Sequence, residues 1–215
     1  YAFSQKNANN AYKHYLNQDF HKAINIYKGM IGDNNSHSIY IPYLLSLIAL
    51  EDYKEAQYLA KRFAKKFPKS LNYKLDIGII HYKSGYFKKS KLTFDNIFKQ
   101  LNGSRSQTIN LANNFIRHKM YTDALSLYEK AEEINSNLAC HIQKAQLFSL
   151  LGDQQSMIVQ YLNELSLNPK SKYIVFSKIQ NFISNDGIKN DNNYSLVRKE
   201  LLPYVYREVD RKEFA

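Results

Sequence analysis

The chain has 215 residues, a formal net charge of +11 and a single cysteine, Cys140. This length is enough to bury a substantial core. One cysteine excludes an intrachain disulfide and any metal site built on several thiolates. The longest apolar run, residues 40–50, is interrupted by Pro42 and Ser46, and it falls short of the roughly 20 residues that a membrane-spanning helix needs. We predict that it is a buried helix.

The first residues suit the end of an export signal. Ala2 and Ser4 are small and two positions apart, as are the −3 and −1 residues of a signal-peptidase site. Residues 1–4 are therefore a candidate signal-peptide remnant, with the mature chain beginning at Gln5. This interpretation predicts a periplasmic or envelope-associated protein. If the chain simply begins at an arbitrary point, a cytoplasmic location is the alternative.

One short pattern then returns about every 34 residues. It consists of an aromatic residue, two spacers, a small residue, three spacers and a second aromatic residue, which Ala60 replaces in the second copy. The small residue is Ala23, Ala56, Ser90 and Ala124 in turn, and Met157 takes its place in a fifth, weaker copy. Such a regular period predicts stacked helical hairpins, none of which buries its apolar face alone.

Each repeat is expected to contain two helices. In the third, residues 72–84 are predicted to form the first helix, and Gly85 to end it. The second helix is expected to begin at Tyr86 and Phe87 and to have the following apolar positions: Leu92, Phe94, Ile97 and Phe98. Proline ends the second and fifth repeats, at Pro68 and Pro169.

Over residues 5–170 this pattern resembles the tetratricopeptide repeat. That family expects a small residue at two positions of each repeat. The second is described above, and the first is occupied by Ala11, Leu44, Gly78, Ala112 and Ala145, of which only Leu44 is large. The resemblance implies that these residues lie where two helices cross. It also implies an all-α fold, a right-handed α-solenoid of about five hairpins at residues 5–36, 37–70, 71–104, 105–137 and 138–170. The usage of Asn, Lys and Tyr is similar to that of tetratricopeptide proteins of Bacteroidetes-type bacteria.

Residues 171–215 depart from the repeat. Helices are predicted at residues 173–183 and 195–208, separated by a polar stretch at 184–193, and Pro203 is expected to interrupt the second helix. Solenoids need a terminal unit with a polar outer face. The segment is therefore predicted to be a C-terminal cap, or else a degenerate sixth repeat of a truncated array.

The usual motifs of catalytic and cofactor sites are missing from the sequence. The seven glycines lie apart, and the six histidines show no metal-binding spacing. Cys140 and His141 are adjacent, so on a helix they point about 100° apart and cannot act as nucleophile and base. Glu132 and Glu133 are expected to be solvated on an exposed helix. We predict no catalytic residue, no metal site and no cofactor.

The resemblance places the first helix of each repeat on a concave face. Positions that face the groove in the family give a predicted partner-binding set: Tyr12, Tyr15, Leu45, Ile48, Ile79, Tyr82, Lys83, Ile109, Asn113, Ile116 and Arg117. A peptide could place apolar side chains there, with an acidic group between Lys83 and Arg117. The family's carboxylate clamp is incomplete, because Ile109 stands where it needs a lysine. The prediction is a non-catalytic scaffold that binds a protein or peptide partner and not nucleic acid.

The alternative function comes from charge. Residues 54–99 contain twelve lysines and arginines against three acidic residues, a local charge of +9. Such a stretch favours polyanions, whether acidic protein, nucleic acid or anionic glycan. An ordinary solvated surface would explain the same residues without a partner. Most of these lysines fall in predicted second helices or turns, away from the groove.

Overall fold

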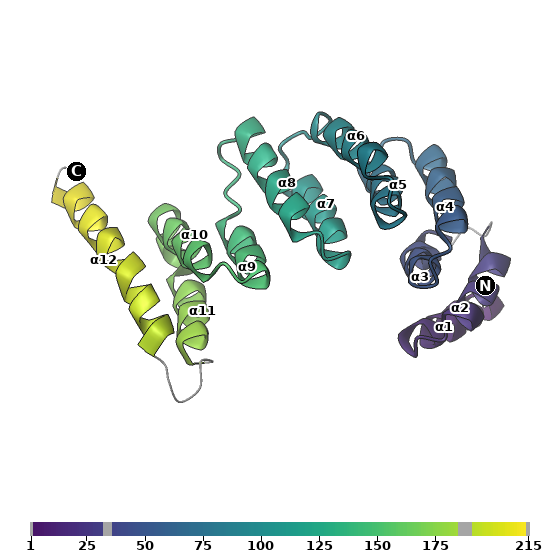
Figure 1. Cartoon of the computed structure of the whole chain (residues 1–215), viewed down its shortest axis with the longest axis horizontal. Helices are drawn as coiled ribbons and strands as arrows, with labels where there is room; N and C mark the ends of the chain where they lie inside the picture. The colour runs from purple at the N-terminus through teal and green to yellow at the C-terminus, as the bar shows by residue number, and fades with distance from the viewer. Residues whose placement is uncertain (1, 32–35, 185–190, 214–215) are drawn as a thin grey trace. The chain divides into compact units, whose positions relative to one another are not determined.

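The computed structural model describes residues 2–31, 36–184 and 191–213, and all regular structure in these ranges is helical (Figure 1). The all-α prediction is therefore confirmed for the described part of the chain. The chain divides into two compact units, Tyr1–Gln100 and Leu101–Ala215. The candidate signal remnant begins at Tyr1, which lies outside the described residues, whereas Ala2 to Ser4 belong to the first helix.

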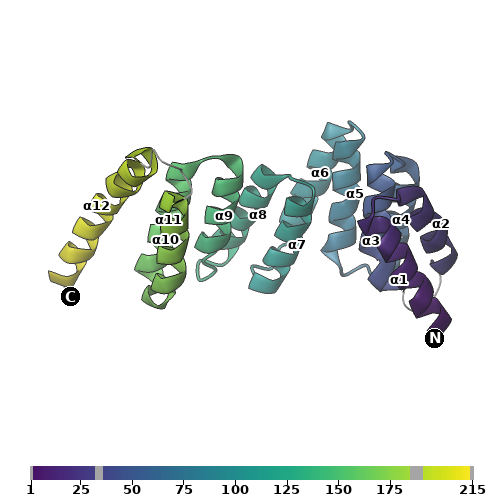
Figure 2. The same cartoon turned by 90° about the horizontal axis from the view of Figure 1, so that it is seen from below.

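The first unit contains six helices among its described residues. They are α1 (Ala2–Leu16), α2 (Phe20–Met30), α3 (Ser36–Ala49), α4 (Tyr53–Lys66), α5 (Leu71–Lys83) and α6 (Phe87–Phe98). Each packs against the next along the chain, and α1 also packs against α3 (Figure 2). The prediction of a helix at residues 72–84 agrees with α5 to within one residue. Stacking of consecutive helical hairpins is thus observed within this unit.

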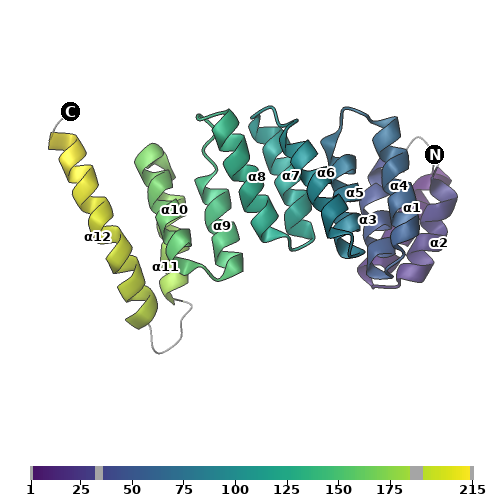
Figure 3. The same cartoon turned by 45° about the horizontal axis from the view of Figure 1, so that its top comes forward.

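The second unit continues with further helices. They are α7 (Arg105–Arg117), α8 (Tyr121–Ile134), α9 (His141–Leu151), α10 (Gln154–Leu167), the short 3₁₀ helix η1 (Pro169–Ser171), α11 (Lys172–Ser184) and α12 (Asp191–Glu213). Consecutive helices again pack together, and α10 contacts both α11 and α12 (Figure 3). Pro203 lies inside α12 and does not end it, so the predicted interruption of this helix is wrong. Most of the predicted polar stretch at 184–193 lies outside the described residues.

The small-residue positions are buried in both units. Ala23, Ala56, Ala112 and Ala124 are completely buried. At Gly78 an added Cβ atom would lie 2.6 Å from Cε1 of Phe94, so α5 and α6 approach each other too closely for any side chain. Leu92, by contrast, was counted among the apolar positions of this helix and is 63% exposed. Phe94 and Ile97 already supply the buried positions of α6, and Leu92 points away from them.

Helices α1, α3, α5, α7 and α9, the first helices of the five hairpins, all end in the same way, with one residue in the left-handed region. These residues are Gln18, Glu51, Gly85, Lys119 and Gly152, with φ of 62°, 57°, 82°, 60° and 77°. After each, the next backbone N–H bonds to a carbonyl five residues earlier: Asp19 to His14, Asp52 to Leu47, Tyr86 to His81, Met120 to Phe115 and Asp153 to Phe148. This is the hydrogen bond of a Schellman-type helix end. One turn geometry is therefore repeated five times at intervals of 33 or 34 residues.

Because each of these five residues has a left-handed backbone conformation, we expect glycine to be more stable there than other residues. A left-handed conformation costs a non-glycine residue about 1–2 kcal/mol, against about 0.5–1 kcal/mol for the greater unfolded-state entropy of glycine. Lys119→Gly is therefore expected to raise the free energy of unfolding by about 0.5–1 kcal/mol in chemical denaturation. The reciprocal control Gly152→Lys, where no atom would obstruct a Cβ, is expected to lower it by about 1 kcal/mol. A loss of stability in Lys119→Gly would contradict this account of the turn.

Hydrogen bonds between tyrosines and polar partners connect successive hairpins of the first unit. The Tyr40 hydroxyl on α3 donates to Oδ2 of Asp76 on α5 at 2.6 Å. Tyr73 on α5 is hydrogen-bonded through its hydroxyl to Nδ1 of His37 on α3, also at 2.6 Å. Both pairs join residues 36 positions apart. These hydrogen bonds thus fix one hairpin to the next with directional contacts as well as with apolar packing.

A largely buried ion pair connects α8 and α9 in the second unit. Oε2 of Glu132 accepts a hydrogen bond from Nζ of Lys144 at 2.6 Å, and Oε1 accepts one from the backbone N–H of Cys140 at 2.9 Å. The side chains retain only 23% and 11% of their exposure. The prediction that Glu132 is solvated is therefore wrong. Only Glu133 is exposed as expected, and it pairs with Lys130 at the surface.

Candidate partner-binding surface

The predicted residues of the first unit lie on α1, α3 and α5. Tyr12 is exposed and its ring stacks on that of Tyr15, with 5.8 Å between the ring centroids. Leu45 and Ile48 are half-buried. Ile79 is completely buried, because α5 packs against both α4 and α6. It belongs to the core and has no surface to offer a partner.

The remaining predicted residues of this unit are exposed at the end of α5, namely Tyr82 and Lys83. Two further aromatic residues lie close by. In the turn that follows, Tyr86 and Phe87 are 58% and 60% exposed, and the rings of Tyr82 and Phe87 meet edge to face with centroids 5.3 Å apart. Three large aromatic side chains are therefore presented to solvent by one helix–turn–helix segment.

Lysines surround these aromatic rings. Nζ of Lys89 lies 5.1 Å from the centroid of the Tyr86 ring, within the range of a cation–π interaction. Lys83 and Lys88 are also exposed. We call this set the turn surface, and it consists of Tyr82, Lys83, Tyr86, Phe87, Lys88 and Lys89. The sequence analysis missed Tyr86 and Phe87 because it assigned them to the start of an amphipathic helix.

The positive charges of the turn surface affect the neighbouring histidine, His81. The His81 ring is half-buried, and its Nε2 lies 2.7 Å from the Gln57 side-chain amide of α4. Burial lowers the pKa of His81, and the charges of Lys89 and Lys61 lower it further. The ring is therefore neutral near pH 7, and Gln57 donates to it. Two lysines that destabilise a third positive charge indicate a positive potential at this end of α5.

The positive charges of the basic stretch, residues 54–99, are not neutralised by salt bridges. Eleven of its twelve basic side chains are exposed and Lys74 is half-buried. None of the salt bridges among the described residues involves any of the twelve. Of the three acidic residues, Asp76 is buried against Tyr40 and cannot neutralise the surface. Most of these cations lie on α4 and α6, as predicted for the second helices.

The predicted residues of the second unit all lie on α7. Ile109 and Ile116 are half-buried, and Asn113 and Arg117 are exposed. Nη1 of Arg117 donates to Oδ1 of Asn114 at 2.6 Å. An acidic subsite shared by Lys83 and Arg117 would involve both units, and it stays a prediction.

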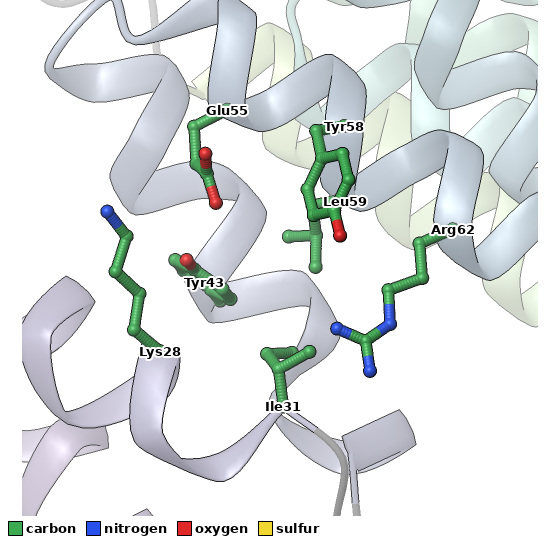
Figure 4. Close-up of a pocket in the computed structure, with 7 residues that line it drawn as sticks. All are labelled: Lys28, Ile31, Tyr43, Glu55, Tyr58, Leu59 and Arg62. Carbon is green, nitrogen blue, oxygen red and sulfur yellow. The ribbon is translucent and has the colours of Figure 1, made fainter.

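A separate pocket of about 110 Å³ opens on the first unit (Figure 4). It lies between the end of α2, α3 and α4. Its lining consists of Lys28, Ile31, Tyr43, Glu55, Tyr58, Leu59 and Arg62. None of these residues belongs to the predicted partner-binding set, although Arg62 lies in the basic stretch of residues 54–99.

Among the described residues we looked for metal-binding groups, membrane-spanning helices and a reactive cysteine. No group of three or more His, Cys, Asp or Glu side chains in the described ranges is placed to hold a metal ion. No helix described by the structure is long and apolar enough to cross a bilayer. Cys140 is completely buried, and burial, together with the charge of Glu132, raises the pKa of its thiol to about 11. A protonated, enclosed thiol is a poor nucleophile.

Comparisons with known proteins find similarity to solved structures but not to protein families or curated sequences. No protein-family model matches the chain, and no curated protein sequence matches it. Among solved structures, a chain in the structure of Naa15/Naa10 bound to HypK-THB is similar over 98% of this chain, with 14% identity and a TM-score of 0.38. This chain spans 35% of the length of that one. A TM-score this low carries no argument, so the assignment depends on the helices and repeated turns described above. On those observations, the part of the chain that the structure describes is all-helical and built from repeated helical hairpins.

Proposed function

We propose that this protein is a non-catalytic scaffold that binds a protein or peptide partner, and that the turn surface is part of its binding site. The observation that carries the proposal is the exposure of Tyr82, Tyr86 and Phe87 in one segment. Aromatic side chains supply much of the energy at protein interfaces, because each buries a large area at a small cost in conformational entropy. The surrounding lysines favour a partner with acidic residues beside its apolar ones.

The other exposed or half-buried predicted residues extend the proposal to α1, α3 and α7. Tyr12, Tyr15, Leu45 and Ile48 would contact the same partner through the first unit, while the residues of α7 would do so through the second. A periplasmic or envelope-associated location is also a proposal, and only the spacing of Ala2 and Ser4 supports it.

The proposal predicts that Tyr82→Ala combined with Lys83→Glu reduces partner capture at least about tenfold, since loss of a central aromatic anchor alone is often worth 2 kcal/mol or more. The protein should remain folded, because both side chains are exposed. The measurement is quantitative mass spectrometry after affinity purification from the native organism, with circular dichroism as a check of folding.

The second unit offers a matched control. Nζ of Lys172 lies 5.0 Å from the ring centroid of Tyr173, and Tyr173 is exposed. Tyr173→Ala with Lys172→Glu therefore makes the same chemical change at another aromatic–lysine pair. Capture at wild-type yield by the Tyr82 and Lys83 variant, or equal losses in both double variants, would remove the turn surface from the proposal.

The uncompensated cations of α4 and α6 favour a second candidate function, the binding of a polyanion. The two functions differ in their dependence on salt. Release of counterions from about four phosphate contacts would weaken binding roughly 100-fold between about 50 and 200 mM salt. Binding through aromatic side chains should change little over that range. Titration of the protein with single-stranded nucleic acid and with a sulfated glycan at several salt concentrations distinguishes them.

A further inference from the structure

The pocket between α2, α3 and α4 has apolar walls and charged ends. Ile31, Leu59 and the ring of Tyr58 provide apolar surface, and Tyr43 lies almost completely buried at its base. Figure 4 shows Lys28 and Arg62 at opposite ends, with Glu55 at the Lys28 end. Such a site can hold a small apolar group and direct its charged end to one side.

The polar groups of the pocket have hydrogen-bonding capacity to spare. Neither Lys28 nor Arg62 forms a salt bridge in the part of the chain that the structure describes. The Tyr43 hydroxyl is directed toward the space between Lys28 and Glu55. Burial raises the pKa of Tyr43, and the charges of Glu55 and Asp52 raise it further, so the hydroxyl keeps its proton and remains a donor.

The charges select the class of ligand. Two cations and one carboxylate give the lining a net charge of +1, which suits a group with a single negative charge. A doubly charged phosphate would be repelled by Glu55 within the same small space. Glu55 and Lys28 offset each other at their end, which leaves Arg62 as the uncompensated cation. The planar guanidinium of arginine matches a carboxylate through two parallel hydrogen bonds.

We propose that this pocket binds a carboxylate joined to a small apolar body, with the carboxylate on Arg62 and the body against Ile31, Tyr58 and Leu59. Such a group is found at the end of a peptide chain and on an acidic side chain next to an apolar one. The pocket and the turn surface share no residue, so the failure of either leaves the other standing.

The test is a nuclear magnetic resonance titration of the full chain that follows the methyl signals of Ile31 and Leu59. The probe is N-acetyl-leucine, and its neutral counterpart is N-acetyl-leucinamide. We expect saturable shifts with the acid and none with the amide. A third probe, N-acetyl-glutamic acid α-amide, carries its carboxylate on the side chain, so comparison with N-acetyl-leucine distinguishes a chain end from an acidic side chain.

Four variants make the test specific. Arg62→Gln should weaken binding of N-acetyl-leucine about tenfold, as expected for loss of a charge-assisted hydrogen bond, and Arg62→Lys should weaken it less. Lys65→Gln removes the same charge from α4 outside the pocket and should have no effect. Glu55→Gln should tighten binding, because it removes a like charge.

Several results would overturn the proposal. These are the absence of saturable shifts, equal binding of acid and amide, and equal effects of Arg62→Gln and Lys65→Gln. Weaker binding in Glu55→Gln would show instead that the pocket recognises a positive group. Because Arg62 is exposed, we expect its variants to fold, and Arg62→Lys provides the readout if Arg62→Gln does not.

Discussion

Glu132→Ala is expected to lower the free energy of unfolding of the second unit by about 3 kcal/mol. The substitution leaves the ammonium group of Lys144 and the backbone N–H of Cys140 without the carboxylate that both now contact. Breaking a buried pair costs more than the pair contributes, because the remaining charge stays desolvated. The expected loss lies toward the lower end of the range for such pairs, since Glu132 retains some exposure.

Cys140 provides a local measurement of this effect. It is the only cysteine in the chain, it is completely buried, and it precedes α9 directly. Its rate of reaction with a thiol reagent under mild denaturant reports the opening of α8 and α9. We expect that rate to rise in Glu132→Ala, both because the segment opens more often and because the carboxylate that raises the pKa of the thiol is gone.

The neighbouring residue is the control. Glu133 is exposed and pairs with Lys130 three positions away on the same helix. Surface pairs of this kind contribute about 0.5 kcal/mol or less, so Glu133→Ala should leave both the denaturation midpoint and the labelling rate nearly unchanged. Equal effects of the two substitutions would contradict the assignment of a buried pair.

Gly78→Ala is expected to destabilise the first unit by about 2 kcal/mol, within the usual range for overpacking. The new methyl group would lie 2.6 Å from Cε1 of Phe94 and 3.1 Å from Cγ2 of Thr93. Phe94 is itself buried, so its ring cannot turn away without disturbing the rest of α6. The sign is informative, because alanine in a helix interior is otherwise more stable than glycine by about 0.5–1 kcal/mol.

Gly29 is the control position, because an added methyl group there would meet no neighbouring atom. It lies in α2, and nothing is within 4 Å of an added Cβ atom. Gly29→Ala should therefore be neutral or stabilising by up to about 0.5 kcal/mol. Chemical denaturation of both variants, followed by circular dichroism, gives the comparison. Matching midpoints for Gly78→Ala and the wild type would mean that α5 and α6 do not approach as closely as described.

The periodic part of the fold could be predicted from sequence because its signal is repeated. Small residues at a fixed interval report helix crossings, and five copies in phase outweigh the irregularity of Leu44 or Met157. The helix of the third repeat was therefore placed to within one residue of α5. A helix boundary that is predicted from a repeated pattern is more reliable than one predicted from a single capping residue.

The side-chain environments were harder to predict, and the reason is physical. Periodicity gives the face of a helix on which a residue lies, but it does not say how many neighbours cover that face. Ile79 was assigned to a groove and is buried, because α5 has helices on two sides. Glu132 was assigned to solvent and is half-buried, because Lys144 lies across from it on the next helix. Both outcomes depend on contacts between residues that are distant in sequence.

The pocket is an example of the same limit. Its lining comes from the end of α2, the middle of α3 and one face of α4, and no local pattern connects Lys28 with Arg62. The exposed aromatic residues of the turn surface, by contrast, carried a local signal. Phe87 is followed directly by Lys88 and Lys89, and an apolar residue in so polar a setting is a candidate for exposure.

The identical helix ends at Gln18, Glu51, Gly85, Lys119 and Gly152 bear on how such a chain changes over generations. Recombination between equivalent points of two copies adds or deletes 33 or 34 residues, and each rejoined turn keeps the same left-handed residue and the same closing hydrogen bond. A new hairpin is then inserted in the correct orientation without any adjustment of the joint. The gene can thus lengthen or shorten its product in whole modules, which leaves the remaining surfaces free to diverge.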